Sequence, residues 1–250
     1  MLKPIKPKKL EDISSEWDEV CTDRHNAIVN DQDISLVSVT APCILRHIAK
    51  DSPIRVLDAG CGTGYLSSLI AKQLIDSGVC YGIDVSIKSI SIAQNNYISE
   101  NLHFLQTSIQ EYCPSSLFDM CVSNMALTCD PNLSKTLKKL YSLLIPGGCL
   151  LIIITHPWFW AQYWGYQDAP WFNYNKEIFI EHNFSITLVK SMGKSTYIHR
   201  PLSQYTSQLL SAGFIIEELE EPYPVGGMPD HYYYRYPRFL FIKCRKPSVN

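Results

Sequence analysis

An acid and three evenly spaced glycines are the part of the sequence best suited to chemistry. The apolar run at residues 54–57 ends at Asp58, and Gly60, Gly62 and Gly64 follow at every second position. Glycine adopts positive φ and lets a ligand or a neighbouring strand approach the backbone closely. Such a loop between a buried strand and a helix cradles nucleotide-like ligands. An acid at this place would repel a pyrophosphate, so Asp58 favours a cationic or amino-bearing ligand.

The spacing of the glycines argues against a nicotinamide dinucleotide. That fingerprint is G-x-G-x-x-G, whereas residues 62–65 read Gly-Thr-Gly-Tyr. A second acid, Asp84, ends the next apolar run, where an open α/β sheet places a carboxylate against ribose hydroxyls. The alternative role for Asp84 is to cap the following helix, although Ser86 is better suited to that role.

The apolar periodicity predicts the elements that position these residues. We expect helices over residues 10–30, 36–49, 65–75, 86–99, 131–144 and 201–213, and strands over 54–57, 79–83, 102–106, 118–123, 149–155, 215–219 and 239–243. Alternating strands and helices predict an α/β fold, with a doubly wound, mostly parallel, seven-stranded sheet that binds ligands beyond the carboxyl ends of its strands. The expected division is an N-terminal helical lid (1–50), a Rossmann-like core (51–156), a cap insertion (157–198) and a C-terminal completion of the core (199–250).

The chain resembles the class I S-adenosylmethionine (SAM) dependent methyltransferases. Their first motif is a hydrophobic strand followed by D/E-x-G-x-G-x-G, as at residues 54–64, and they carry an acid at the end of the second strand, as Asp84 is. Their L-x-P-G-G turn before an apolar strand matches residues 144–148. The pattern H-R-P-L-S-x-Y followed by A-G-F, at residues 199–214, is similar to small-molecule methyltransferases of bacterial natural-product pathways. The resemblance implies a Rossmann-like methyltransferase fold, SAM as cofactor and S-adenosylhomocysteine as product.

The resemblance also implies which residues bind the cofactor. The family often places an Asp after the third strand, where it accepts the adenine amino group, but Ser108 stands there in this chain. The adenine contact would then run through the Ser108 hydroxyl or the Ile109 backbone. Adenine-N6 and glutamine methyltransferases carry N/D-P-P-Y after the fourth strand, and its absence here argues against methylation of DNA bases or glutamine. The expected cofactor-binding residues are Asp58, Gly60, Cys61, Gly62, Gly64, Asp84, Val85, Ser108, Ile109, Asn124 and Met125, with Cys61 a packing residue rather than a nucleophile.

An excess of aromatic side chains follows the fifth strand. Nine of the residues between 158 and 174 are aromatic, against 12% in the whole chain, and we expect a further strand at residues 186–189. The rings either form the cap's own small core or line an apolar acceptor pocket. In the second interpretation the acceptor would contact Trp158, Trp160, Trp164 and Tyr197.

Three polar residues near the expected acceptor are candidates for catalysis or binding. His156 comes directly after the fifth strand, and a pKa near 7 would suit a general base. The alternative is a strand-end histidine bonded to the backbone. His199 and Arg200 could bind an acidic group of the acceptor, the arginine in bidentate fashion. Alternatively they form an ion pair with Glu220 or Glu221.

Methyl transfer from SAM is an in-line displacement, so the protein mainly positions the reactants and excludes water. We predict O-methylation of a small, partly aromatic or apolar metabolite. The alternatives are methyl ester formation on a small acid or a peptide C-terminus through His199 and Arg200, N-methylation, or a non-catalytic SAM-binding protein.

Composition excludes several other classes of function. A net charge of -2 gives no electrostatic footprint for nucleic acid, and no run approaches the 18 apolar residues of a membrane span. The nine cysteines form no C-x-x-C pair, and no Cys–His pair stands out at metal-ligand spacing, so we expect reduced thiols, no metal and a cytoplasmic location. The expected partner is a small-molecule or short-peptide substrate, and the expected state a monomer or homodimer.

Overall fold

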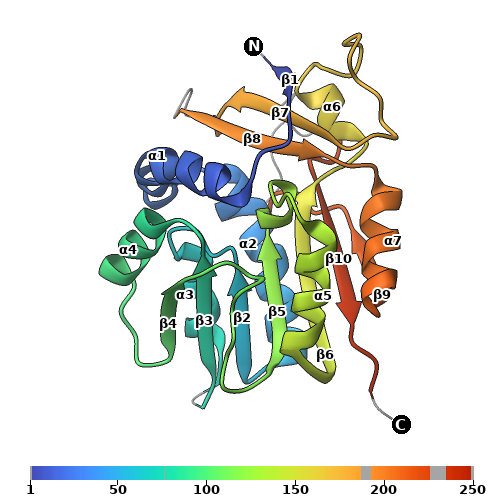
Figure 1. Cartoon of the computed structure of the whole chain (residues 1–250). Coiled ribbons are helices and arrows are strands. Elements are labelled where there is room, and N and C mark those ends of the chain that lie inside the picture. Colours follow the sequence, from blue (N-terminus) through green and yellow to red (C-terminus); the bar gives the residue numbers. More distant parts are fainter. Residues whose placement is uncertain (1, 76, 187–192, 226–234, 249–250) are drawn as a thin grey trace.

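A seven-stranded sheet with helices on both faces forms the centre of the protein (Figure 1). The computed structural model describes residues 2–75, 77–186, 193–225 and 235–248. The strand order is β4-β3-β2-β5-β6-β10-β9; the first five are parallel, and β10 runs antiparallel to both its neighbours. This confirms the predicted doubly wound α/β fold. The strands are β2 (Arg55–Ala59), β3 (Val79–Asp84), β4 (Leu102–Gln106), β5 (Phe118–Asn124), β6 (Leu144–Thr155), β9 (Ile215–Glu220) and β10 (Phe239–Arg245).

The helices follow the predicted periodicity with two corrections. The segment expected as one helix over 36–49 is a π-helix followed by an α-helix, and the helix expected from Pro131 begins at Leu133, because Asn132 is its N-cap. Ser86 caps its helix as predicted, by accepting a hydrogen bond from the backbone N–H of Ser89 at 3.0 Å. The helices are α1 (Leu10–Val29), η1 (Ser35–Thr40), α2 (Ala41–Asp51), α3 (Tyr65–Gln73), α4 (Ile87–Asn96), η2 (Ala126–Thr128), α5 (Leu133–Leu143), α6 (Phe159–Tyr163) and α7 (Leu202–Ala212).

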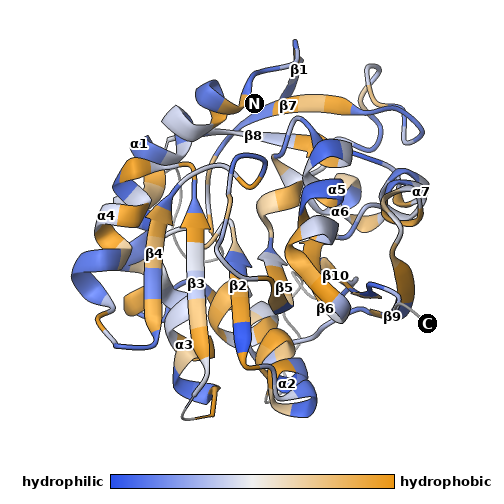
Figure 2. Cartoon of the chain, turned by 60° about the horizontal axis from the view of Figure 1, so that its bottom comes forward, coloured by the Kyte–Doolittle hydropathy of each residue, from blue (hydrophilic) through white to orange (hydrophobic). Residues whose placement is uncertain are grey.

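The sheet is buried on both faces, so its central strands are apolar at consecutive positions. Val56 and Leu57 are neighbours on β2, yet Val56 packs with residues of α2 and α3 while Leu57 packs with residues of α5 and α7. Both side chains are fully buried. Figure 2 shows hydrophobic residues along the strands. Truncating Leu57 to Ala would cost about 2–5 kcal/mol of stability. No helix in the described part of the chain has the length and apolar composition to cross a bilayer.

A second, smaller sheet lies over the carboxyl ends of the parallel strands, beside α1 (Figure 1). It is antiparallel in the order β1-β7-β8, formed by β1 (Lys3–Ile5), β7 (Ile178–Asn183) and β8 (Lys194–His199). The sequence analysis missed all three strands. It expected one at residues 186–189, of which 187–189 lie outside the described residues. We call β1, β7, β8 and the segment from Trp158 to Glu177 the cap.

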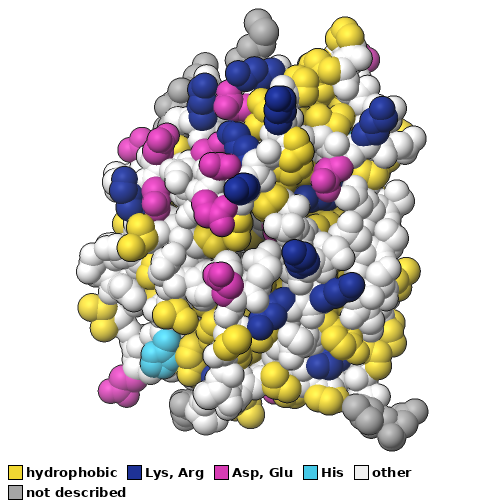
Figure 3. Space-filling model, in the orientation of Figure 1, with side chains coloured by type: hydrophobic (Ala, Val, Ile, Leu, Met, Phe, Trp, Pro, Cys, Tyr) yellow, Lys and Arg dark blue, Asp and Glu magenta, His cyan; other side chains and the backbone are white. Residues whose placement is uncertain are grey.

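Polar contacts hold α1 between this cap and the central sheet. On the core side, the Ser14 hydroxyl donates to the Val85 carbonyl at 3.1 Å. On the cap side, the Thr196 hydroxyl donates to Glu16 at 3.1 Å. Basic and acidic side chains are interspersed over this end of the molecule (Figure 3), and Lys3 forms an ion pair with Glu181 at 3.1 Å. The helix therefore forms a wall that both layers share.

Candidate active site

Three connected cavities lie where the parallel strands end, beneath α1 and the cap. The first, of 110 Å³, is lined by the glycine loop and the residues that follow β3, β4 and β5; we call it the glycine-loop cavity. The second, of 280 Å³, is lined largely by aromatic rings of the cap and is called the aromatic cavity. The third, of 40 Å³, contains Asp58 and is called the Asp58 recess. Arg24 and Asn124 line all three, so the cavities meet at these two side chains.

The glycines of the loop are required by its conformation. Gly60, Gly62 and Gly64 have φ of 85°, 54° and 85°, the left-handed region that other residues rarely adopt. A Cβ on Gly60 would overlap the Cβ of Ala126, and one on Gly64 would lie 2.7 Å from the Phe104 ring. The loop thus approaches its neighbours as closely as glycine permits, and Gly60 and Gly62 line the glycine-loop cavity.

Asp84 ties the end of β3 to this loop. One carboxylate oxygen accepts the Gly62 N–H and the other accepts the Ser86 N–H, each at 2.9 Å. Burial raises the pKa of Asp84 above its usual value, while these two hydrogen bonds favour the ionised form. The side chain lines the glycine-loop cavity next to Val85, with Ile109 also in the wall.

Two residues of the predicted cofactor set have local roles in packing or turn formation. Ser108 does not line the cavities: its hydroxyl donates to the Glu111 carboxylate at 2.9 Å and accepts the Glu111 N–H at 3.2 Å, so it serves the following turn. Of Ser108 and Ile109, the two residues expected to contact adenine, Ile109 is the one that lines the glycine-loop cavity. Cys61 lines the Asp58 recess, and burial raises the pKa of its thiol well above the usual value. An inert packing role for Cys61 fits that environment.

Asp58 is a buried carboxyl with spare bonding capacity. It is 1% exposed, and its Oδ2 accepts a hydrogen bond from the Ser67 hydroxyl at 2.6 Å. Within the described residues its Oδ1 has no hydrogen-bond partner. Burial raises the pKa of Asp58 to about 7. A ligand that brings a positive charge into the recess would both bond this oxygen and favour the ionised carboxylate.

The three cavities meet at a strained turn after β5. Met125 has φ of 68°, unusual for a residue with a side chain, and its N–H donates to the Ile153 carbonyl at 2.7 Å. Asn124 donates to the Thr40 hydroxyl at 3.2 Å. Such strain of about 1–3 kcal/mol persists where the surroundings impose it, often at ligand sites.

Arg24 of α1 faces the same junction. Its guanidinium carbon lies 5.6 Å from the centroid of the Trp17 ring and 6.0 Å from that of Phe184, and its Nε is 3.7 Å from a carboxylate oxygen of Asp33. Sequence analysis missed Arg24. Its signal was periodicity, because Trp17, Cys21 and Arg24 share one face of a helix and all three line the glycine-loop cavity.

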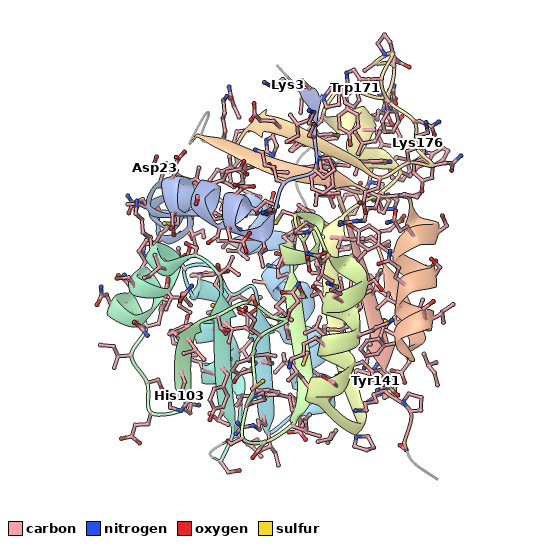
Figure 4. All side chains as sticks on the ribbon, in the orientation of Figure 1. Lys3, Asp23, His103, Tyr141, Trp171 and Lys176 are labelled. Carbon is pink, nitrogen blue, oxygen red and sulfur yellow. The ribbon has the colours of Figure 1, made fainter. Side chains whose placement is uncertain are left out.

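The aromatic residues of the cap divide into two sets. Trp160, Trp164 and Tyr197, three of the expected acceptor contacts, line the aromatic cavity, and the rings of Trp160 and Trp164 lie 4.8 Å apart. Tyr166 instead stacks at 5.5 Å on the half-buried Trp171, which Figure 4 labels near the top of the cap. One set of rings therefore lines a cavity, and the other packs within the cap.

Trp158 does not contribute to the cavity. Its side chain is 63% exposed and packs edge-on against Tyr174 at 5.1 Å. It therefore lies on the outer surface of the cap, because the chain turns into α6 directly after it.

His156 also lies outside the cavity walls. Its Nδ1 accepts the backbone N–H groups of Trp158 and Phe159 at 3.3 and 3.4 Å, and its Nε2 is 3.0 Å from the Glu221 carboxylate. Both ring nitrogens are thus engaged in holding the start of α6. This is the alternative that the sequence left open, a strand-end histidine bonded to backbone.

Arg200 and His199 are buried structural residues as well. The Arg200 Nε forms an ion pair with Glu177 at 2.6 Å, rather than with either acid at 220–221, and its two Nη atoms donate to backbone carbonyls at 3.1 and 2.6 Å. His199 donates to a backbone carbonyl at 3.0 Å. Neither lines the three cavities, because the start of α7 is packed against the turn that follows β5.

A histidine that sequence analysis overlooked does line the aromatic cavity. His182 lies opposite Ser195 on β8, and its Nε2 is 2.9 Å from the Ser195 hydroxyl. Its Nδ1 is 3.1 Å from the Asn183 carbonyl, which can only accept, so Nδ1 carries the hydrogen and Nε2 accepts from Ser195. Burial lowers the pKa of His182 to about 4, so the ring is neutral at neutral pH.

Comparison with known proteins agrees with this geometry. The family model for a methyltransferase domain matches residues 50–169, the segment that carries the glycine loop, Asp84 and the turn after β5. Residues 50–169 are therefore similar to known methyltransferase domains, and the fold is that of SAM-dependent methyltransferases. The solved structure of a candidate SAM-dependent methyltransferase from Listeria monocytogenes is 26% identical with a TM-score of 0.64, over 83% of this chain and all of that one.

Two curated relatives match shorter segments. A malonyl-[acyl-carrier protein] O-methyltransferase of Priestia megaterium is 32% identical over 39% of this chain and 35% of its own length. A trans-aconitate 2-methyltransferase of Rhodopseudomonas palustris is 29% identical over 44% of this chain and 41% of its own length. The chain therefore spans less than half of each of these relatives, and the cap lies mostly outside the segment that the family model matches.

Proposed function

We propose that this chain transfers the methyl group of SAM to an oxygen atom of a small, partly aromatic or apolar acceptor. The observation that carries the proposal is the junction at Arg24, Asn124 and Met125. There a cavity suited to a nucleoside meets a larger aromatic cavity. Methyl transfer is an in-line displacement and needs two reactants held end to end, away from water.

The donor would occupy the glycine-loop cavity and the Asp58 recess. In this proposal the ribose hydroxyls bond Asp84, and the adenine ring packs against Ile109. The ammonium group of the methionine part would bond the free oxygen of Asp58, and its carboxylate would face Arg24. The Trp17 ring lines the junction, where a sulfonium would gain on the order of 1 kcal/mol from its face.

The acceptor would occupy the aromatic cavity, with the Ser195–His182 pair receiving its proton. Methylation of a neutral hydroxyl oxygen produces an oxonium, whose proton is strongly acidic, so a weak base is sufficient. That proton would pass to the Ser195 oxygen while the Ser195 hydroxyl proton passes to His182 Nε2. This pair replaces His156 as our proposed proton acceptor, since it lines the cavity and His156 does not.

A carboxylate acceptor is the second candidate. Two cationic side chains, Arg24 and Arg238, line the aromatic cavity. The two curated relatives are named for malonyl and aconitate substrates, which are acids. A carboxylate is already nucleophilic and would need orientation rather than a base, so loss of His182 would leave its methylation unchanged.

Calorimetry followed by an acceptor screen tests the proposal. S-adenosylhomocysteine should bind one to one and NAD should not, and Asp84→Ala should weaken binding by about tenfold or more, as expected for a lost charged hydrogen bond. Asp168→Ala, on an exposed acid of the cap, is the matched control. If Asp84→Ala bound S-adenosylhomocysteine with unchanged affinity, the assignment of Asp84 to the ribose would be wrong. Binding without methyl transfer from labelled SAM to any phenol, alcohol, amine or acid in a metabolite library would favour a non-catalytic SAM-binding protein.

A further inference from the structure

A cluster of metal-ligating side chains lies outside these cavities, between α2 and β9. Cys43 and His47 are four residues apart on α2 and so share one face of the helix. Glu220 ends the neighbouring strand β9. One sulfur, one imidazole nitrogen and one carboxylate oxygen from these residues all lie within 4.8 Å of one another. Sequence analysis overlooked this Cys–His pair, whose third member is distant in sequence.

His47 has no hydrogen-bond partner that would explain its burial. It is 3% exposed, and within the described residues neither of its ring nitrogens makes a hydrogen bond. Its Nε2 is 3.9 Å from a Glu220 oxygen, which is too long for one. Each buried, unbonded polar atom costs about 1–3 kcal/mol, and such atoms often mark a bound water or ion. The ring is held by stacking on Phe241 at 4.4 Å, which fixes the direction of both nitrogens.

The charges around the cluster favour a cation. Glu218 and Glu220 are the acidic groups that act on the His47 ring, and Arg46 and Lys243 are the basic ones. Lys243 is engaged by Asp51 in an ion pair of 2.7 Å. Three acids (Glu218, Glu220 and Asp51) therefore lie near two bases (Arg46 and Lys243) while the Cys43 thiol is still neutral.

Arg46 occupies the place that a cation would take. Its Nη2 bonds the Glu220 carboxylate and lies 3.8 Å from Cys43 Sγ. The Arg46 side chain is 57% exposed, so it can turn into solvent when a metal arrives. Glu220 is 30% exposed in its side chain and provides a path of entry from the surface.

We propose that Cys43, His47 and Glu220 bind a zinc ion. Sulfur, imidazole nitrogen and carboxylate oxygen are the ligands that zinc takes in proteins, and a water from the Glu220 side would complete four-coordination. The Cys43 thiol becomes a thiolate as the Zn–S bond forms, and its proton leaves to solvent with no change in oxidation state. Zinc affinity should fall as the pH is lowered, because the Cys43 thiol must lose its proton to bind the metal.

The zinc would link α2 to β9 behind the wall of the aromatic cavity. The helix that carries Cys43 and His47 continues directly from η1, whose Thr40 lines that cavity and bonds Asn124. A bond between α2 and β9 therefore stabilises the position of this wall. The expected role is structural, because the cluster does not line any of the three cavities.

The site is tested by titrating Co²⁺ into the full chain after EDTA has removed any bound metal. One equivalent of Co²⁺ should produce a thiolate-to-cobalt charge-transfer band, and Zn²⁺ should abolish it. Cys43→Ser should lose the band, whereas Cys244→Ser, on another fully buried free thiol, should retain it. Should Cys43→Ser fail to fold, Glu220→Gln is the alternative, with zinc affinity reduced by about tenfold or more.

Thermal unfolding supplies an independent measurement. Zn²⁺ should raise the Tm of wild type and Cys244→Ser but not of Cys43→Ser or His47→Gln. Absence of the cobalt band from wild type, or an equal zinc-induced Tm shift in wild type and Cys43→Ser, would overturn the proposal. Neither measurement involves SAM, so the result is independent of the proposed methyl transfer.

Discussion

The glycine-loop cavity and the aromatic cavity are built in opposite ways. The first lies between α1 and the loops at the ends of parallel strands, where a left-handed loop approaches Ala126 so closely that no side chain fits at Gly60. The second is lined by large side chains from α1, α6, β7, β8 and β10. The difference indicates that the glycine-loop cavity, the proposed donor side, tolerates little change in shape at its loop. The aromatic cavity, the proposed acceptor side, can change its lining by exchange of single rings.

The largest effect is expected from Gly60→Ala on the donor side. The added Cβ would overlap Ala126 and would also be strained at φ of 85°, so binding of S-adenosylhomocysteine should fall by about 100-fold or more. Gly165→Ala is the control, because Gly165 also has positive φ but no atom within 4 Å of the added Cβ. Calorimetry measures binding and thermal melting measures stability. Equal losses of binding in the two variants would show that strain, not close approach, matters.

A smaller effect, confined to turnover, is expected from His182→Gln. Loss of the proton acceptor should lower kcat by about 100-fold on a hydroxyl acceptor, with binding of S-adenosylhomocysteine unchanged. His156→Gln should leave kcat near the wild-type value, since its ring lies outside the cavity walls. The reverse pattern of kcat in the two variants would return His156 to the role of base.

Trp164→Ala should affect the acceptor but not the donor. Removing one ring of the aromatic cavity should raise KM for the acceptor by roughly tenfold, without weakening S-adenosylhomocysteine. Trp171→Ala is the matched variant, because that ring packs in the cap's own core. Trp171→Ala should lower Tm more than it raises KM. Similar KM values for the two variants would remove the distinction between the two sets of rings.

The smallest effect is a pH dependence on the donor side. Because burial raises the pKa of Asp58 to about 7, the protonated carboxyl stabilises the free fold at low pH, and this contribution is lost as pH rises through 7. An ammonium ligand requires the ionised form. The Kd for S-adenosylhomocysteine should therefore rise by up to about tenfold per unit as the pH falls below 7. In Asp58→Asn this slope should disappear; a slope retained there would assign it to another group.

The residues around the glycine loop were easier to place from the sequence than those of the aromatic cavity, for a physical reason. Asp58 and Asp84 lie on two neighbouring strands and the glycines directly follow the first of them, so local spacing was enough to place them at one edge of the sheet. His199 and Arg200 have side chains suited to binding an acid, but what they face is decided by tertiary contacts, and Arg200 is occupied by Glu177.

The acceptor side also depends on pairing between distant segments. His182 and Ser195 come together only because β7 pairs with β8, and no periodic pattern in the sequence indicated either strand. Cys43 and His47 were visible as helix neighbours, but their third partner, Glu220, belongs to the far end of the chain. A single sequence does not reveal which side chains are brought together by pairing of distant segments.

The pairing of β1 with β7 joins the start of the chain to a strand that is made much later. Residues 3–5 find their partners at 179–181 only after the five parallel strands β2 to β6 have been synthesised, and closing so long a loop is entropically slow. The strands around the glycine loop can therefore pair before the sheet of the cap is complete. In hydrogen-exchange experiments, β1 should be among the last segments to gain protection during folding. It should also be among the first to lose protection when the cap opens.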